Sequence, residues 1–219
     1  MPRSTGDLVV DTLRRPPGLQ HLELDLLHSP KGAPPTFQLR SLRFGNHITR
    51  SLATFLTKSS SHTLVNISVT LEDDRDDPAW SILRTFTNLT RLHLDFVRRP
   101  LVSLPLDAFT FLEHLSFGSF VDCRDIRRLK PSDSPHHLVI RWPPSLQSLT
   151  TYSHICYTPT IILDFLGSTK SPRLRRICLK IAGLDGCWSV QEQQEVRDAC
   201  ARRGVAVMTL SQGRGRLAA

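Results

Sequence analysis

Apolar residues recur along the chain in one repeated order, an L-x-x-L-x-L phrase whose apolar positions hold mainly leucine, isoleucine, valine or phenylalanine. Seven copies can be recognised, beginning at Leu19, Leu39, Leu64, Leu89, Leu112, Leu146 and Leu174. These first residues are separated by 20, 25, 25, 23, 34 and 28 positions. Such near-regular repetition indicates one supersecondary unit that is repeated along the chain.

Each phrase has the alternation of a β-strand, because successive side chains of a strand point to opposite faces of its sheet. The second and third apolar positions therefore point together into a core, while their neighbours point outward. One such strand cannot bury its apolar side alone, so the copies are expected to stack as a parallel sheet. The sixth copy departs from the pattern, with Thr151 in the third apolar position.

Helical patterns lie between some of the strands, where a parallel connection has to return the chain. We expect helices near 48–57, from Pro78 to Phe86, and over 160–166. The clearest is Ser189 to Arg203, where Ser189 and Glu192 have the spacing of a capping box and Gly204 can end the helix. Residues 205–210 then read as a last strand.

The predicted fold class is α/β, a leucine-rich-repeat solenoid with a curved parallel sheet on its concave face and helices or loops on its convex face. Five of the six separations fall within the roughly 20–29 residues typical of leucine-rich repeats. The expected organisation is an N-terminal segment or cap (1–18), a repeat domain (19–210) and a disordered tail (211–219). The one long separation predicts a Pro-rich insertion near 118–145, which includes Pro131 and Pro135.

Stacked strands align equivalent outward positions into columns, about 4.8 Å apart from strand to strand. These columns are expected to form the concave face, where solenoids usually bind. They are polar, of mixed charge and rich in His and Arg, which suits contacts with a protein or peptide. The candidate protein-binding residues are His21, Glu23, Arg43, Arg91, His93, Asp95, His114, Tyr152, Arg176 and Lys180. An ordinary solvated sheet face is the alternative.

The net charge of +8 changes this picture little, because the basic residues are spread over short clusters. A basic scaffold that binds nucleic acid or acidic surfaces is kept as the alternative function. It is not preferred, because aromatic residues make up only 7% of the chain, too few for the stacking platforms of single-stranded nucleic-acid binding. No stretch of 18 uncharged apolar residues occurs, so no membrane contact is expected.

Enzyme chemistry and metal binding find little support in the sequence. The nucleophile-elbow, dinucleotide and P-loop motifs are absent, so no catalytic residue and no cofactor are expected. His93, Asp95 and His114 resemble a metal cluster, but a metal site needs three or four convergent ligands with supporting contacts. The five cysteines form no CxxC pair, which favours reduced thiols in a cytoplasmic or nuclear protein.

Several fragments resemble the leucine-rich region of F-box proteins, especially the irregular fungal type: GLQHLELDL, NLTRLHLDF, FLEHLSFGSF, PPSLQSLT and PRLRRICLKIAG. The resemblance spans roughly residues 17–210 and implies a substrate-recognition module of a ubiquitin-ligase adaptor. It implies a protein partner, and a ubiquitin-ligase core as a further partner only if an F-box is missing from this chain. No F-box is recognisable, since residues 1–18 are too few for one, so either the chain is a fragment or it works without one.

Overall fold

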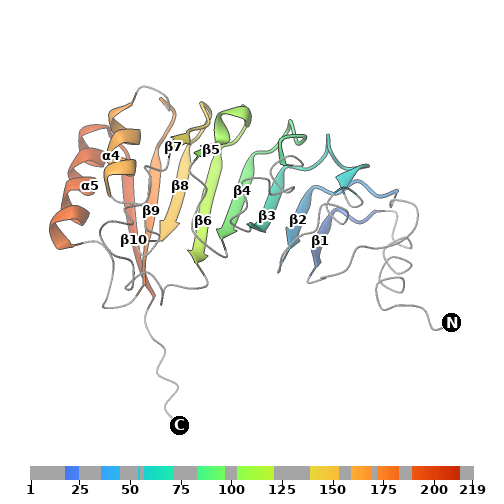
Figure 1. Cartoon of the computed structure of the whole chain (residues 1–219), viewed down its shortest axis with the longest axis horizontal. Helices are drawn as coiled ribbons and strands as arrows, with labels where there is room; N and C mark the ends of the chain where they lie inside the picture. Colours follow the sequence, from blue (N-terminus) through green and yellow to red (C-terminus); the bar gives the residue numbers. More distant parts are fainter. Residues whose placement is uncertain are drawn as a thin grey trace, which may run out of the picture.

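The computed structural model describes ten parts of the chain: residues 18–24, 36–44, 54, 57–71, 83–96, 103–120, 139–152, 159–168, 172–182 and 189–212. Eight strands form one open sheet in the order β1-β2-β3-β4-β6-β8-β9-β10, and every neighbouring pair is parallel. Their bounds are β1 His21–Leu24, β2 Ser41–Phe44, β3 Asn66–Leu71, β4 Arg91–Phe96, β6 His114–Phe120, β8 Ser148–Tyr152, β9 Arg176–Ala182 and β10 Ala206–Gln212. The fold class is therefore α/β with a single all-parallel sheet, and the strands lie side by side in chain order (Figure 1).

The seven apolar phrases coincide with seven of these strands. Their second apolar positions form one continuous row across the sheet, from Leu22 through Leu92 and Leu115 to Ile177. The expectation of parallel strands that follow one another in one sheet is thus confirmed. β10, the last strand, continues the row with Val207 opposite Ile177.

One hydrophobic cluster runs along one face of the sheet, which we call the packed face. From the second copy onward it contains the described apolar second and third positions together with the first positions, which lie in the turns before the strands, while Leu19 and Leu22 of the first copy are partly buried and pack against it. Leu92 and Leu115 are only 2% and 1% exposed. Thr151 is buried as well, so the sixth phrase keeps the inward direction although its third slot is polar.

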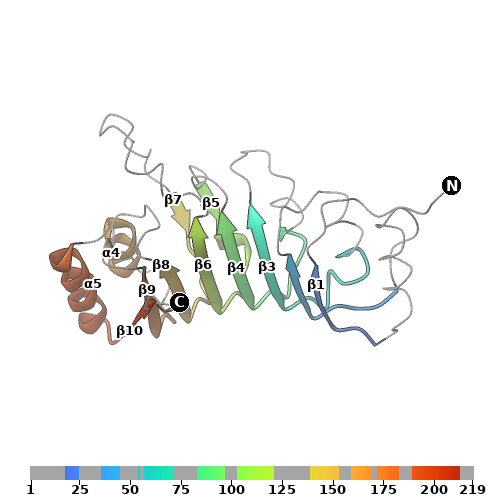
Figure 2. The same ribbon diagram turned by 90° about the horizontal axis from the view of Figure 1, so that it is seen from below.

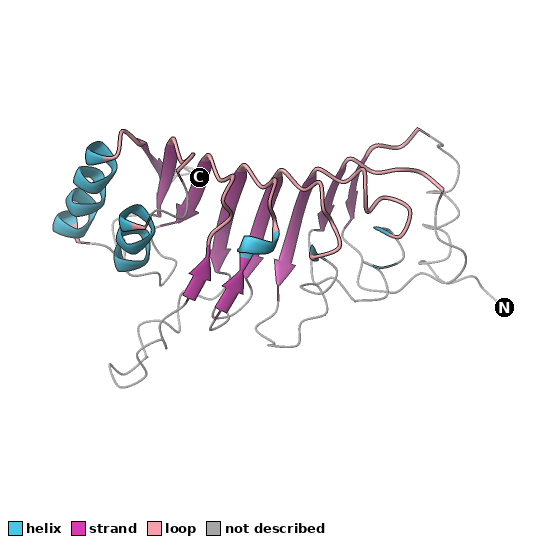
Figure 3. Cartoon of the chain, turned by 90° about the horizontal axis from the view of Figure 1, so that it is seen from above, coloured by secondary structure: helices cyan, strands magenta, loops and turns pink. Residues whose placement is uncertain are grey.

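The turns before the strands are joined by a ladder of backbone hydrogen bonds. Gln20, Arg40, Val65, Thr90, Glu113, Gln147 and Arg175 each offer a carbonyl that accepts from the next turn or strand. Figure 3 shows these turns along one margin of the sheet. Because each link joins one copy to the next, the ladder fixes the register before the strand begins.

Buried hydroxyl groups strengthen two of these links. Ser60 Oγ accepts a hydrogen bond from the Leu39 amide at 2.9 Å, and Ser145 Oγ donates to the Leu112 carbonyl at 2.8 Å. Both serine side chains are buried, so each satisfies a backbone group that water does not reach. Neither contact follows from the apolar repeat.

Two helices pack at the β8–β10 end, and Figure 2 shows them together at that end of the sheet. Helix α4 is Pro159–Gly167 and helix α5 is Val190–Arg202, close to the predicted ranges. Ser189 and Glu192 form the predicted capping box, and Gly204 has a φ of 66°, a conformation that favours glycine. Arg203 donates to the carbonyls of Leu166 and Ser168, which ties the end of α5 to the end of α4.

The other expected helices lie mostly outside the described residues. Of the range 48–57 only Thr54 and Thr57 are described, both in helical conformation. Of the range 78–86, residues 83–86 are described as the end of a helical turn, with Leu83 and Phe86 buried in the core.

A second, two-stranded sheet is not foreseen by the repeat. It pairs β5, Ser103–Pro105, in parallel with β7, Val139–Arg141, and a short 3₁₀ turn, Leu106–Ala108, follows β5. The expected insertion near 118–145 thus begins within β6 and ends in a segment that contains β7, while residues 121–138 lie outside the described residues. Trp142 in that segment is buried and stacks on Phe165 of α4, with ring centroids 4.0 Å apart.

Candidate binding surface

The face opposite the leucine core is here called the open face. It carries the alternate strand residues, and among those whose side chains are described all but Gly118 and Cys178 are exposed or half-buried. Eight of the ten candidate residues have described side chains on this face: His21, Glu23, Arg43, Arg91, His93, Asp95, His114 and Arg176. Their exposure leaves the open face accessible in the described part of the chain.

Tyr152 and Lys180 complete the predicted set. Their backbones are opposite each other in β8 and β9, at the third outward position of each strand. They continue the row that the sequence predicts, although their side chains lie outside the described residues.

Strand register brings the first two outward positions into straight rows. One row includes Asn66, Arg91 and His114, which are direct neighbours on β3, β4 and β6. The next row includes Glu23 and Arg43 on β1 and β2, and further along the sheet His93. These straight rows follow from the parallel register, because the backbone hydrogen bonds between turns align the first residues of neighbouring strands.

The third row is disturbed between β4 and β6. Leu94 is opposite Phe117, but Phe96 is opposite Phe120, so β6 accommodates one more residue than β4. A bulge of this kind bends the strand locally and redirects side chains beside it. Asp95 lies at this irregularity, which the sequence spacing does not reveal.

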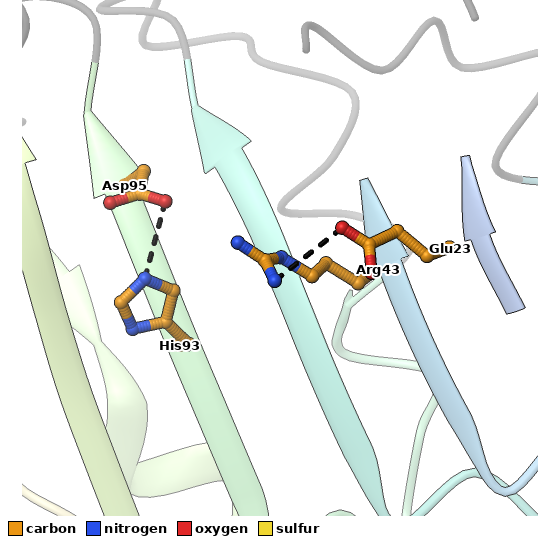
Figure 4. A network of polar contacts seen from close by, with 4 residues as sticks. All are labelled: Glu23, Arg43, His93 and Asp95. Atoms are coloured by element: carbon orange, nitrogen blue, oxygen red, sulfur yellow. Dashed lines mark hydrogen bonds and ion pairs between the residues drawn. The ribbon is translucent and has the colours of Figure 1, made fainter. Parts of the chain in front are cut away.

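Among the described residues, an ion pair and a His–Asp hydrogen bond lie on the open face (Figure 4). Arg43 Nη1 is 3.4 Å from Glu23 Oε1, and both side chains are mostly exposed. His93 Nε2 is 3.2 Å from Asp95 Oδ2, and both side chains are about one third exposed. An exposed pair such as Glu23–Arg43 contributes little to stability, so it can be exchanged for contacts with a partner at small cost.

His114, which the sequence groups with His93 and Asp95, does not join them. Its Nε2 lies 4.0 Å from Oε2 of Glu113, the residue directly before β6. No group of three or more His, Cys, Asp or Glu side chains within the described ranges is placed to hold a metal ion. The His93–Asp95 pair is therefore described as a polar contact of the surface.

Gly118 is a feature that the sequence analysis missed. A Cβ atom at position 118 would lie 1.5 Å from Asp95 Oδ1 and 3.2 Å from His93 Nε2. The Asp95 carboxylate thus occupies the space that a side chain at position 118 would fill. In this position the carboxylate lies beside His93. The only sequence signal is a glycine within a strand, which often marks a close approach or a bulge.

The character of the open face changes at its C-terminal end. Cys178 of β9 is buried, and Met208 and Leu210 of β10 are exposed. In register, Met208 lies opposite Cys178 and Leu210 opposite Lys180. The mixed polar rows thus give way to an apolar strip on the last strand, which the count of charges does not predict.

No helix in the part of the chain that the structure describes is long and apolar enough to cross a bilayer. Comparison of the chain with family models, with curated proteins and with solved structures gives no match. The open face therefore has to be interpreted from its own residues and their register.

Proposed function

We propose that the chain is a leucine-rich-repeat solenoid that holds another protein on its open face, in the manner of the substrate-recognition region of an F-box protein. The single observation that supports this most is the register, which aligns exposed polar side chains of successive strands into rows. A row of this kind is held by the sheet and loses little conformational entropy on binding. The proposed solenoid would have this face on its concave side.

The proposed centre of the site is the middle of β4. Arg91 is exposed there, beside Asn66 and His114, while His93 and Asp95 contact each other. Arginine is enriched among residues that dominate binding energy, and such residues cluster near the centre of an interface. Arg91 is therefore the side chain that we expect to contribute most.

The function needs no turnover and no cofactor. Binding would rest on charge-assisted hydrogen bonds from Arg91 and Arg176, and on exposed groups such as Glu23 and Arg43. The resemblance further supports the role of a ubiquitin-ligase adaptor, which requires an F-box elsewhere in the polypeptide.

The experiment is capture of partners on the immobilised full chain, with Arg91→Ala and Arg202→Ala as a matched pair. Both arginines are exposed, but Arg202 ends helix α5, away from the open face. Arg91→Ala should lower recovery of specific partners by about tenfold, which corresponds to about 1.4 kcal/mol. Arg202→Ala should leave recovery unchanged. Equal recovery from wild type and Arg91→Ala would contradict the assigned centre.

A second candidate, a basic scaffold for nucleic acid, is favoured by one observation. Arg173, Arg175 and Arg176 are all exposed within four residues at the start of β9. Phosphate binding weakens steeply with salt, so retention on heparin or DNA between about 50 and 200 mM salt tests it. Steep loss of retention, together with weaker retention of Arg175→Ala, would favour this candidate over protein binding.

A further inference from the structure

Strand β10 is an edge strand of the sheet in the part of the chain that the structure describes. β10 pairs with β9, and it is the terminal strand of the eight. The Ala206 amide donates to the Arg175 carbonyl at 2.9 Å, so Ala206 directs its backbone groups toward β9. Because backbone direction alternates along a strand, Val207, Thr209 and Ser211 direct their N–H and C=O groups away from the sheet.

The residues of β10 include none of the types that usually prevent an edge strand from pairing. Natural edge strands are commonly blunted by charged side chains, by proline or by being very short. β10 has seven residues, Ala206–Gln212, with the sequence AVMTLSQ, which contains neither a charged residue nor proline. Two of its side chains on the open face, Met208 and Leu210, are 44% and 46% exposed.

We propose that β10 pairs with β10 of a second copy of this chain, antiparallel, around a two-fold axis at Thr209. The outward groups of Thr209 would then pair with those of its counterpart, and Val207 would pair with Ser211 of the other copy. The same register places Met208 beside Leu210 of the other copy, twice, on one continuous open face. Cross-strand apolar pairs of this kind stabilise antiparallel strands.

The residues of β1, at the opposite edge of the sheet, explain why we expect β10 to pair with β10 of the second copy and not with its β1. β1 has only four residues and presents His21 and Glu23 on the open face. Parallel docking of β10 on β1 would set the apolar Met208 row against the polar side chains of His21 and Glu23. Such head-to-tail docking would also continue without limit from copy to copy. The two-fold pairing is self-complementary and closes after two copies.

Self-association through β10 is independent of the proposed partner site, which is centred on β4. Two paired strands of seven residues make a small interface, so we expect a weak dimer with a dissociation constant on the order of micromolar. The helix α5 borders this edge on the packed side, where Arg197 donates to Thr209 Oγ at 3.4 Å. That contact uses the Thr209 side chain and none of its backbone groups.

The test is sedimentation velocity of the full chain from about 1 to 200 µM, a range that brackets a micromolar constant. The mass should rise from 24.7 kDa toward twice that value. Leu210→Lys places a charge at the apolar pair and should raise the dissociation constant at least about tenfold. Phe111→Lys adds the same charge at another exposed apolar residue, away from β10, and should leave the dimer intact.

Thr209→Pro gives an independent check, because it removes an outward N–H and keeps the donors that face β9. It should also abolish the dimer, while circular dichroism confirms that the variant is folded. If Thr209→Pro does not fold, Leu210→Lys decides alone. A wild type that stays monomeric throughout, a mass that grows beyond the dimer, or a dimer that survives Leu210→Lys would overturn the proposal. Equal loss of the dimer in Phe111→Lys would overturn it too.

Discussion

The Asp95 carboxylate of β4 lies over the backbone of Gly118 of β6, where a side chain at position 118 would otherwise be. A Cβ there would lie 1.5 Å from Asp95 Oδ1 and 2.6 Å from Asp95 Cγ, so the carboxylate would have to rotate away to make room for it. The bulge between β4 and β6 brings these residues together. The φ of Gly118 is not positive, so its backbone conformation does not require glycine. Glycine is instead favoured at this position by the nearby Asp95 side chain.

Replacement of Gly118 by alanine tests this relationship. Gly118→Ala should lower the free energy of unfolding by no more than about 1 kcal/mol, because Asp95 can rotate away and loses only its partly exposed contact with His93. In an Asp95→Ala background the same replacement should cost much less, since the obstructing carboxylate is gone. Urea denaturation of the four proteins of this double-mutant cycle measures the coupling. An equal cost of Gly118→Ala in both backgrounds would contradict the relationship.

The leucine core predicts a large effect of cavity-forming substitutions in mid-sheet. Leu92 and Leu115 are direct neighbours in the row of second apolar positions, and both are almost fully buried. Replacing either with alanine should lower the free energy of unfolding by about 2–5 kcal/mol. Ser68→Ala, on the open face of β3, is the control and should change it by less than about 0.5 kcal/mol. Changes below about 1 kcal/mol at both leucines would show that the strand register is wrong.

The strand positions, their order and their parallel pairing could be predicted because they depend on local alternation and repeat spacing. Leu92 and His93 differ by one position, and the period of two alone assigns them to opposite faces. Helix α5 could be predicted for a similar reason, since Ser189, Glu192 and Gly204 act within a few residues of each other.

Features that depend on contacts between distant parts could not be predicted in this way. The approach of Asp95 to Gly118 needs a bulge that no repeat spacing reveals, and β5–β7 pairing joins residues 103–105 to residues 139–141 near the end of the long insertion. For the site, the outward rows followed from the alternation, but His114 turned out to contact Glu113 and not His93. The exposed apolar strip on β10 was missed because the exposure of Met208 and Leu210 depends on β10 being the terminal strand of the described sheet.

The buried hydroxyl links between turns lead to a third prediction. Ser60→Ala should lower the free energy of unfolding by about 1–3 kcal/mol, because the buried Leu39 amide would lose its acceptor. Ser59 Oγ donates to the Phe37 carbonyl and is partly exposed, so water can replace it in Ser59→Ala. The difference between these adjacent serines, measured by chemical denaturation, isolates the buried link. A cost of Ser60→Ala no larger than that of Ser59→Ala would contradict it.

Cys200 of helix α5 gives the last prediction, which concerns alkaline pH. Its side chain is buried, and burial raises the pKa of the thiol from 9.0 to about 11, because a thiolate loses its hydration there. Between these two values the unfolded chain releases the proton while the folded chain keeps it. The contribution of Cys200 to stability is therefore complete below about pH 9 and is lost as the pH rises toward about 11. The slope can reach about 1.4 kcal/mol per pH unit.

Cys200→Ala removes this titration, and subtracting its free energy of unfolding from that of the wild type cancels other groups that ionise in the same range. The difference should be constant from about pH 7 to pH 9 and then fall. A difference that stays flat up to pH 11 would show that the thiol ionises equally in both states.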